Sequence, residues 1–203
     1  MSFGAFLITS FIIILMPGTG VVYTISTGIM NGRQKSIIAA LGCTLGIVPH
    51  LCLSIALTSM LMQLNSTVFT VMKYAGAAYL IYMGIGMIRS KDGIQLEDAD
   101  ATENARSIIR KGILINLLNP KLTLFFFSFL PQYVRETDGQ FVIQSAVLGV
   151  AFMIMTFVVF AIYGLLAGMA GSWLVKSQKR VSVLQKIFGT VFIGFALKLA
   201  LEN

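Results

Sequence analysis

The residues best suited to chemistry lie between Asn116 and Lys121. This stretch places two amides, Asn116 and Asn119, next to Pro120 and Lys121 inside an apolar run, Ile113 to Leu130, long enough to predict a membrane span. Pro120 has no N–H, so the Asn116 carbonyl loses its helical partner, and the residue before a proline is pushed out of helical geometry. A mid-membrane lysine costs about 2.5–3.5 kcal/mol on insertion scales. We therefore expect this segment to line a polar site and not to face lipid.

A second interruption, Pro17-Gly18, lies in the first apolar segment. Pro17 frees the Ile13 carbonyl, and Gly18 lets a substrate or another backbone come close. Taken alone, this pair is equally well explained by a proline kink packed against a neighbouring helix.

Together the two interruptions match an α-amino acid zwitterion. Freed carbonyls near Pro17 could hold an ammonium group, while Lys121 and the half-helix N-terminus at Pro120 could hold a carboxylate. The alternative for Lys121 is a lysine that snorkels to a membrane interface. The predicted substrate-binding residues are Pro17, Gly18, Asn116, Asn119, Pro120 and Lys121.

His50 is the one histidine of the chain and lies near the middle of the second apolar segment. Histidine changes charge near neutral pH, so His50 could relay a proton, and Lys121 is the other candidate for proton coupling. An equally weighted alternative is a histidine hydrogen-bonded to a neighbouring helix. Every Asp and Glu falls in a loop or at the C-terminus, which argues against a carboxylate-based proton or metal-ion pathway.

The elements that position these residues are predicted to be membrane helices. The chain has 203 residues, of which 57% are hydrophobic and 11% charged, with a mean hydropathy of +0.86. A soluble domain of this size cannot hide so much apolar surface, so we predict an all-α integral membrane protein. Its six apolar segments are 3–29, 37–62, 68–88, 108–130, 141–169 and 181–201.

Basic residues set the expected orientation. Most of the 15 lysines and arginines lie in the first, third and fifth connections between these segments. The positive-inside rule then places these connections in the cytoplasm and both termini outside. It also explains the net charge of +7 without a nucleic-acid partner.

An internal repeat is visible in matched prolines, glycines and aromatic residues. Pro17 matches Pro120, Gly42 matches Gly149, and Lys73-x-x-Gly76-x-x-Tyr79 matches Lys186-x-x-Gly189-x-x-Phe192. Each half holds three segments, so the second half enters the membrane from the opposite side. We predict two inverted three-helix repeats, 1–89 and 108–203, with proline-interrupted first and fourth helices and a cytoplasmic linker, 90–107.

Glycines and cysteines have structural explanations. Gly42-x-x-x-Gly46 is a close-packing motif within the subunit or between subunits of a homo-oligomer, and Gly76 and Gly189 are further predicted helix-packing positions. Cys43 and Cys52 are too far apart along one helix to form a disulfide and are expected to be buried. No metal-ligand cluster, nucleotide motif or nucleophile–base pair is present in the sequence, so we expect neither a cofactor nor an enzyme.

At these residues the chain resembles the LysE/RhtB superfamily of amino-acid exporters, particularly the homoserine/threonine efflux branch. The resemblance covers almost the whole chain and is carried by four stretches: Pro17-Gly18; Gly42-x-x-x-Gly46-x-x-x-His50; Lys73-Tyr74-x-Gly76-Ala77-Ala78-Tyr79-Leu80; and Asn116-x-x-Asn119-Pro120-Lys121 through Phe129-Leu130-Pro131-Gln132.

The resemblance implies a six-helix protein of the bacterial inner membrane that exports amino acids, with proton exchange as the energy source. Thr19 and Ile47 depart from the proline and the acidic residue that many relatives have there. These departures bear on the substrate and the coupling ion more than on the fold.

Two other functions remain open at this point. A membrane conduit for thiol electrons needs a cysteine in each half, whereas Cys43 and Cys52 both lie in the first half. A non-transporting membrane scaffold has no need of a mid-membrane lysine.

Overall fold

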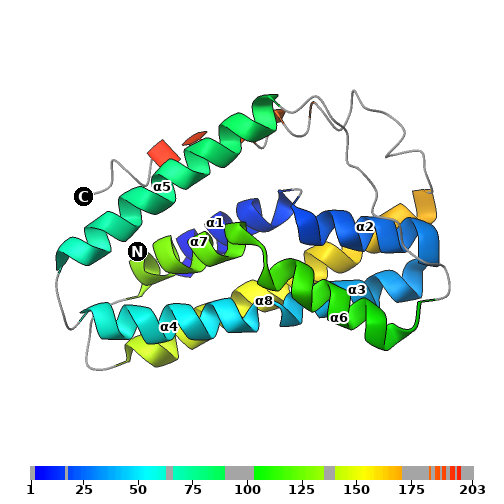
Figure 1. The fold of residues 1–203 in the computed structure, drawn as a ribbon, viewed down its shortest axis with the longest axis horizontal. Helices are drawn as coiled ribbons and strands as arrows, with labels where there is room; N and C mark the ends of the chain where they lie inside the picture. Colours follow the sequence, from blue (N-terminus) through cyan, green and yellow to red (C-terminus); the bar gives the residue numbers. More distant parts are fainter. Residues whose placement is uncertain are drawn as a thin grey trace.

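A computed structural model of the chain describes residues 3–16, 18–62, 66–89, 103–134 and 140–170, together with isolated helical positions between 183 and 197. The described elements are helical throughout (Figure 1). In chain order they are α1 (Phe3–Leu15), α2 (Thr19–Asn31), α3 (Arg33–Leu45), α4 (Val48–Met62), α5 (Ser66–Arg89), α6 (Ala105–Leu117), α7 (Pro120–Ser128), the 3₁₀ turn η1 (Leu130–Tyr133) and α8 (Phe141–Ala170).

The first and fourth apolar segments are both interrupted, as the sequence predicts. The axes of α1 and α2 differ by 55°, and the same angle separates α6 from the stretch Pro120–Tyr133. Asn119 has the extended conformation expected before a proline (φ −81°, ψ 107°), and Gly18 is also extended (φ −127°, ψ −179°). Pro17 itself lies outside the described residues.

The second apolar segment contains a break that we did not predict. It begins at Arg33, earlier than expected, and α3 ends at Leu45 before α4 starts at Val48. The Ile47 N–H donates to the Thr44 carbonyl three residues back (3.0 Å), which tightens the chain between the two helices. Pro49, which cannot donate to the Leu45 carbonyl, is the sequence signal for this break.

Gly32 makes the tight turn between α2 and α3. Its φ of +87° lies in the region that only glycine adopts without strain. The turn folds α3 back along α2 and places Arg33 at the start of α3.

Glycines bring the helices of the two halves into backbone contact. A Cβ added to Gly42 would lie 2.7 Å from the Ile109 carbonyl oxygen, and one added to Gly46 would lie 2.7 Å from that of Ile113. Gly112 faces α3 in the same way, 2.8 Å from the Cys43 nitrogen. These three glycines seat α3 directly on α6. In the sixth segment, a Cβ on Gly189 would lie 2.6 Å from the Gly84 carbonyl of α5; Gly76 lies within α5.

The fifth segment is one unbroken helix, α8, which matches the predicted range to within one residue. It contacts α1, α2, α3 and α4, whereas α5 lies to one side, against α7 and α4 (Figure 1). In the described part of the chain, two helical stretches are long and apolar enough to cross a membrane, Arg33–Ser59 and Phe141–Met169, and the two bent pairs raise the number to four. Six spans and an inverted repeat therefore remain predictions.

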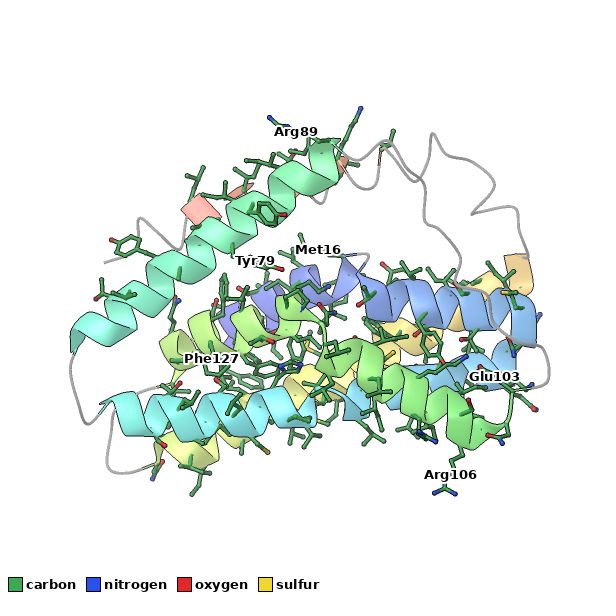
Figure 2. The ribbon with its side chains drawn as sticks, viewed as in Figure 1. Met16, Tyr79, Arg89, Glu103, Arg106 and Phe127 are labelled. Atoms are coloured by element: carbon green, nitrogen blue, oxygen red, sulfur yellow. The ribbon has the colours of Figure 1, made fainter. Side chains whose placement is uncertain are left out.

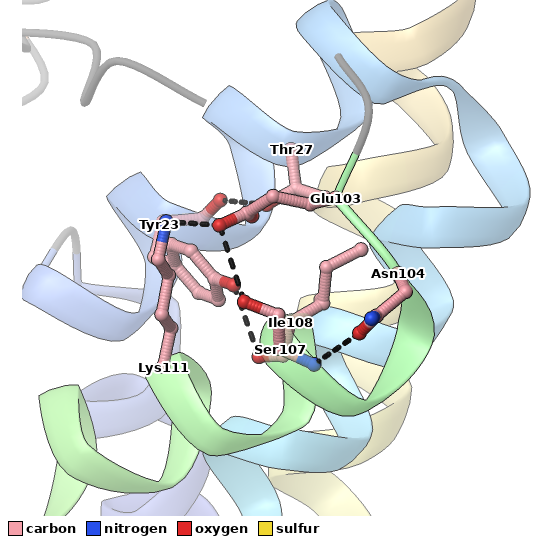
Figure 3. A network of polar contacts seen from close by, with 7 residues as sticks. All are labelled: Tyr23, Thr27, Glu103, Asn104, Ser107, Ile108 and Lys111. Carbon is pink, nitrogen blue, oxygen red and sulfur yellow. Dashed lines mark hydrogen bonds and ion pairs between the residues drawn. The ribbon is translucent and has the colours of Figure 1, made fainter. Parts of the chain in front are cut away.

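A polar network fixes the start of α6 at one end of the bundle (Figure 3). Asn104 caps the helix by accepting a hydrogen bond from the Ser107 N–H (2.8 Å), so α6 begins at Ala105, before the predicted start at 108. Glu103 forms an ion pair with Lys111 and accepts from the Ser107 hydroxyl (3.3 Å). The Tyr23 hydroxyl of α2 donates to the Ile108 carbonyl (3.0 Å), which ties α2 to α6.

Candidate functional site: a junction of interrupted helices

The site lies where three helix interruptions meet in the middle of the bundle, where Figure 2 places Met16. At the first of its helix ends, Pro120 occupies the first turn of α7, and the Asn119 side chain accepts a hydrogen bond from the Lys121 N–H (3.0 Å). A proline and an asparagine cap at these positions favour a helix start here. The sequence itself therefore builds a new helix N-terminus inside the bundle.

Lys121 reaches from this helix end to the end of α1. Its ammonium donates to the carbonyls of Ile13 (3.3 Å) and Met16 (3.2 Å), and the side chain is only 7% exposed. A Cβ on Gly18 would stand 3.1 Å from the Lys121 Nζ, so glycine leaves the room that the ammonium needs. Lys121 was predicted to bind a substrate carboxylate. In the structure it donates instead to the freed carbonyls that were predicted to bind a substrate ammonium.

Asn116 connects the fourth segment to the break in the second. Its Nδ2 donates to the Cys43 carbonyl in the last turn of α3 (2.7 Å). This bond orients the amide, so Oδ1 points away from Cys43 and toward Gly20, where an added Cβ would be only 2.5 Å from it. Asn116 is 1% exposed, and its Oδ1 has no hydrogen-bond partner among the described residues. A buried acceptor without a partner is costly, which makes this oxygen a candidate ligand contact.

His50 compensates for the proline break in the fourth segment. Its Nε2 lies 2.9 Å from the Asn116 carbonyl, which also accepts from the Asn119 N–H (3.1 Å). A carbonyl only accepts, so this contact assigns the proton to Nε2, and in the neutral ring Nδ1 then accepts from the Thr123 hydroxyl (3.1 Å). His50 therefore makes the interhelical hydrogen bond that was one of its two predicted roles.

Several helix C-termini of each half are capped by side chains of the other half. Tyr163 of α8 donates to the Leu15 carbonyl at the end of α1 (2.8 Å), and Ser54 of α4 donates to the Phe126 carbonyl of α7 (2.6 Å). Lys121, Asn116 and His50 follow the same rule. Backbone groups freed inside a membrane must find partners, and here the partners join the two halves.

A small cavity lies between these groups. Its volume is about 10 Å³, which is room for about one water molecule. The polar groups at its wall come from Asn116, Asn119, Lys121 and Thr156, and apolar and glycine residues complete the lining: Ile13, Ile14, Gly18, Gly20, Val21, Leu122, Phe152 and Phe160. The cavity is therefore too small for an amino acid in this structure.

An aromatic cluster lies on the α1–α7 side of the cavity. Phe125 stacks on Phe152 with ring centroids 4.6 Å apart, and on Phe129 at 5.7 Å. Phe6 meets Tyr133 edge to face at 5.3 Å, and the Tyr133 hydroxyl shares a hydrogen bond with Thr9 (2.9 Å). Aromatic pairs of this kind add about 0.5–1.5 kcal/mol each beyond their burial. The cluster packs α1, α7, η1 and α8 against one another, and Phe152 joins it to the cavity wall.

Most of the predicted site residues meet at this junction. Gly18, Asn116, Asn119 and Lys121 line the cavity, Pro120 begins α7 beside them, and His50 contacts the Asn116 carbonyl. The cysteine expectation is half wrong: Cys43 is buried beside Thr24, but Cys52 is exposed on α4. Its position on the outward face of the helix explains the difference.

Sequence reasoning missed one face of α8. Phe152, Thr156 and Phe160 all line the cavity and are spaced four residues apart. Thr156, a hydroxyl inside a long apolar run, is the signal that could have found this face. Tyr163 lies one turn further on, and its hydroxyl caps α1.

The chemistry available here is binding and not bond making. The site holds one ammonium, two amides and several carbonyls, and within the described ranges no three His, Cys, Asp or Glu side chains gather where a metal could bind. Interrupted helices that hold polar groups in mid-bundle are typical of secondary transporters. Fold and site together define the class of membrane transport proteins.

The chain belongs to the LysE type translocator family, whose sequence model matches residues 11–203. It is 31% identical over 189 residues to the homoserine/homoserine lactone efflux protein of Salmonella typhimurium, covering 93% of this chain and 91% of that protein. It is also 31% identical over 205 residues to the leucine efflux protein of Klebsiella pneumoniae (96% and 92%), and 29% identical over 210 residues to that of an Enterobacter species (98% and 95%).

These matches confirm the resemblance to the LysE/RhtB superfamily of amino-acid exporters, and the chain is a transporter of this kind and not an enzyme. No solved structure is significantly similar to it.

Proposed function

We propose that this chain exports neutral amino acids, of the homoserine, threonine or leucine type, across the bacterial inner membrane as a secondary transporter. The observation that carries the proposal is the unpartnered Asn116 Oδ1 beside the Lys121 ammonium in a cavity between interrupted helices. Relatives named for homoserine and leucine efflux support the substrate class.

Each part of an amino acid has a complementary group at the junction. The carbonyl end of α1, at Ile13 and Met16, suits the ammonium group. Lys121 and the N–H groups at the start of α7 suit the carboxylate, because a helix N-terminus carries positive dipole. The walls formed by Val21, Phe152 and Phe160 suit an uncharged side chain.

The transport cycle would move the two halves of the molecule against each other. The equal bends of 55° in the first and fourth segments support an inverted repeat of 1–89 and 108–203. The distribution of basic residues would place the linker in the cytoplasm and both termini outside. In such repeats, rocking of one half against the other exposes a fixed mid-membrane site to each side in turn. Because the cavity is closed, an amino acid would enter only when the helix ends separate.

Proton exchange would supply the energy, with His50 or Lys121 as the coupling residue. His50 bridges the carbonyl of Asn116 and the hydroxyl of Thr123, so a change in its protonation would alter contacts on both sides of the break between α6 and α7. A histidine at such a joint can link charge to conformation.

Counterflow in liposomes tests the proposed function. Purified protein is reconstituted, loaded with one unlabelled amino acid, and supplied outside with a labelled panel that includes homoserine, threonine, leucine, lysine and glutamate. We expect accumulation of neutral members and none of glutamate. A protein that neither binds nor moves any amino acid would favour a scaffold, and activity that requires Cys43 and Cys52 would favour a thiol conduit.

A further inference from the structure

We propose that the Lys121 ammonium is a tethered stand-in for the substrate's own ammonium group, which must displace it from the end of α1. The inference rests on the proposed function and assigns an ammonium-binding site to the carbonyls of Ile13 and Met16, completed by Asn116 Oδ1. The site takes primary ammonium compounds, and the lysine restricts it to those that also carry a carboxylate.

The carbonyls that Lys121 occupies have the chemistry of a cation site. The last carbonyls of a helix have no intrahelical partner, and they lie at the negative end of the helix dipole. Ile13 and Met16 both direct their carbonyl oxygens to the Lys121 Nζ, at 3.3 and 3.2 Å, in a place where the lysine is 7% exposed. Two carbonyl oxygens with this geometry bind a cationic donor, whether the donor belongs to the protein or to a ligand.

Asn116 Oδ1, which lines the same cavity, provides independent evidence. Asn116 Oδ1 is fully buried, and its orientation is fixed because Nδ2 is held by the Cys43 carbonyl at 2.7 Å. It has no partner among the described residues, and it lines the same cavity as Lys121. An ammonium group has three donors, so an incoming one could bond the two carbonyls and this amide oxygen together.

A displaced Lys121 needs a new partner. Once it leaves the α1 carbonyls, its charge is buried without a partner, which is strongly unfavourable. A substrate carboxylate, placed near the N-terminus of α7, supplies the missing partner. A compound with an ammonium but no carboxylate displaces Lys121 and leaves it uncompensated. The exchange of partners therefore favours zwitterions over simple amines, and in the empty carrier the lysine keeps α1 joined to α7.

The test compares three ligands of one shape: leucine, leucinol, which lacks the carboxylate, and 4-methylpentanoate, which lacks the ammonium. Binding is measured by calorimetry on purified wild type, Lys121→Met and Lys121→Gln. The glutamine keeps an uncharged donor for the carbonyls, so it carries the test if the methionine variant does not fold. We expect leucinol to bind about tenfold or more tightly to either variant than to wild type, while leucine binds more weakly. We expect no binding of 4-methylpentanoate to the variants.

Two results would overturn the inference: leucinol binding that the substitutions leave unchanged, or leucine binding that rises together with leucinol. The first would mean that Lys121 does not compete for the ammonium site, and the second that it does not receive the carboxylate. Failure of the proposed function is distinguishable, because wild type would then show no counterflow of any amino acid.

Discussion

At the residue scale, a buried cation is held by backbone carbonyls and not by a carboxylate. Within the described residues, the hydrogen bonds of the Lys121 ammonium go to Ile13 and Met16, while the ion pair between Glu103 and Lys111 lies at the far end of α6. Dipoles can stabilise a charge without neutralising it. A protonated Lys121 therefore leaves a positive charge that no carboxylate in the cavity lining offsets.

Gly20 provides a steric test of the Asn116 acceptor that leaves its chemistry intact. A Cβ at this position would lie 2.5 Å from Asn116 Oδ1 and 2.9 Å from a Phe160 ring carbon. We expect Gly20→Ala to reduce transport at least about tenfold and to cost about 1–3 kcal/mol of stability through overpacking. Gly4→Ala is the matched control, because a Cβ there meets nothing within 4 Å. Liposome transport and thermal unfolding measure both effects, and equal activity of the two variants would contradict the account.

His50→Gln separates the two roles of the histidine. The glutamine amide can donate to the Asn116 carbonyl as Nε2 does, but it cannot titrate near neutral pH. We expect His50→Gln to keep the melting temperature near that of wild type. His50→Ala should lose about 1–3 kcal/mol of stability and therefore melt at a lower temperature. If His50 couples protons, His50→Gln keeps counterflow and loses transport driven by a pH gradient. Normal gradient-driven transport by His50→Gln would assign coupling to another residue.

The sequence indicates which residues lie at the junction, but it does not indicate the hydrogen bonds that they make. Lys121, Asn116 and Asn119 stand out because polar groups are rare in an apolar run, and the prolines show which carbonyls are freed. That Lys121 bonds Ile13 and Met16 could not be predicted, because it depends on the distance between two segments about one hundred residues apart. Side-chain direction follows from packing that no local pattern encodes.

At the element scale, the breaks create helix ends inside the bundle. These ends offer backbone groups that a continuous helix would bond internally. The breaks at Asn119 and near Pro17 follow from proline chemistry and were predictable. The break between α3 and α4 was not predicted, although Pro49 in the first turn of α4 is a sequence signal for it. It matters because the Cys43 carbonyl, in the last turn of α3, accepts the hydrogen bond that orients Asn116.

Gly46→Ala tests the seating of α3 on α6. The added methyl would meet the Ile113 carbonyl oxygen at 2.7 Å and the Asn116 Cβ at 2.9 Å, and neither neighbour is a flexible side-chain end. We expect a loss of about 1–3 kcal/mol, seen as a lower melting temperature in detergent, together with reduced transport. Gly86→Ala serves as the control, because a Cβ on Gly86 has open space around it. An unchanged melting temperature for Gly46→Ala would contradict the close contact.

At the scale of the whole molecule, the proposed direction of transport depends on the orientation of the protein in the membrane. Gln34, just after the Gly32 turn, and Gln140, just before α8, are both exposed and lie in connections predicted to face opposite sides. In a Cys43→Ser, Cys52→Ser background, we expect Gln140→Cys to react with an impermeant thiol reagent in intact spheroplasts. Gln34→Cys should react only after the membrane is opened. The reverse pattern would invert the topology and the direction of transport.

The central claim is that the junction of interrupted helices binds the transported amino acid. Counterflow of labelled leucine and homoserine by Lys121→Ala, reconstituted in the same amount as wild type, tests it most directly. Lys111→Ala is the matched control, because Lys111 is half-exposed in the middle of α6 and does not line the cavity. The account predicts that Lys121→Ala falls at least about tenfold while Lys111→Ala keeps the wild-type rate. Wild-type counterflow by folded Lys121→Ala protein would contradict it.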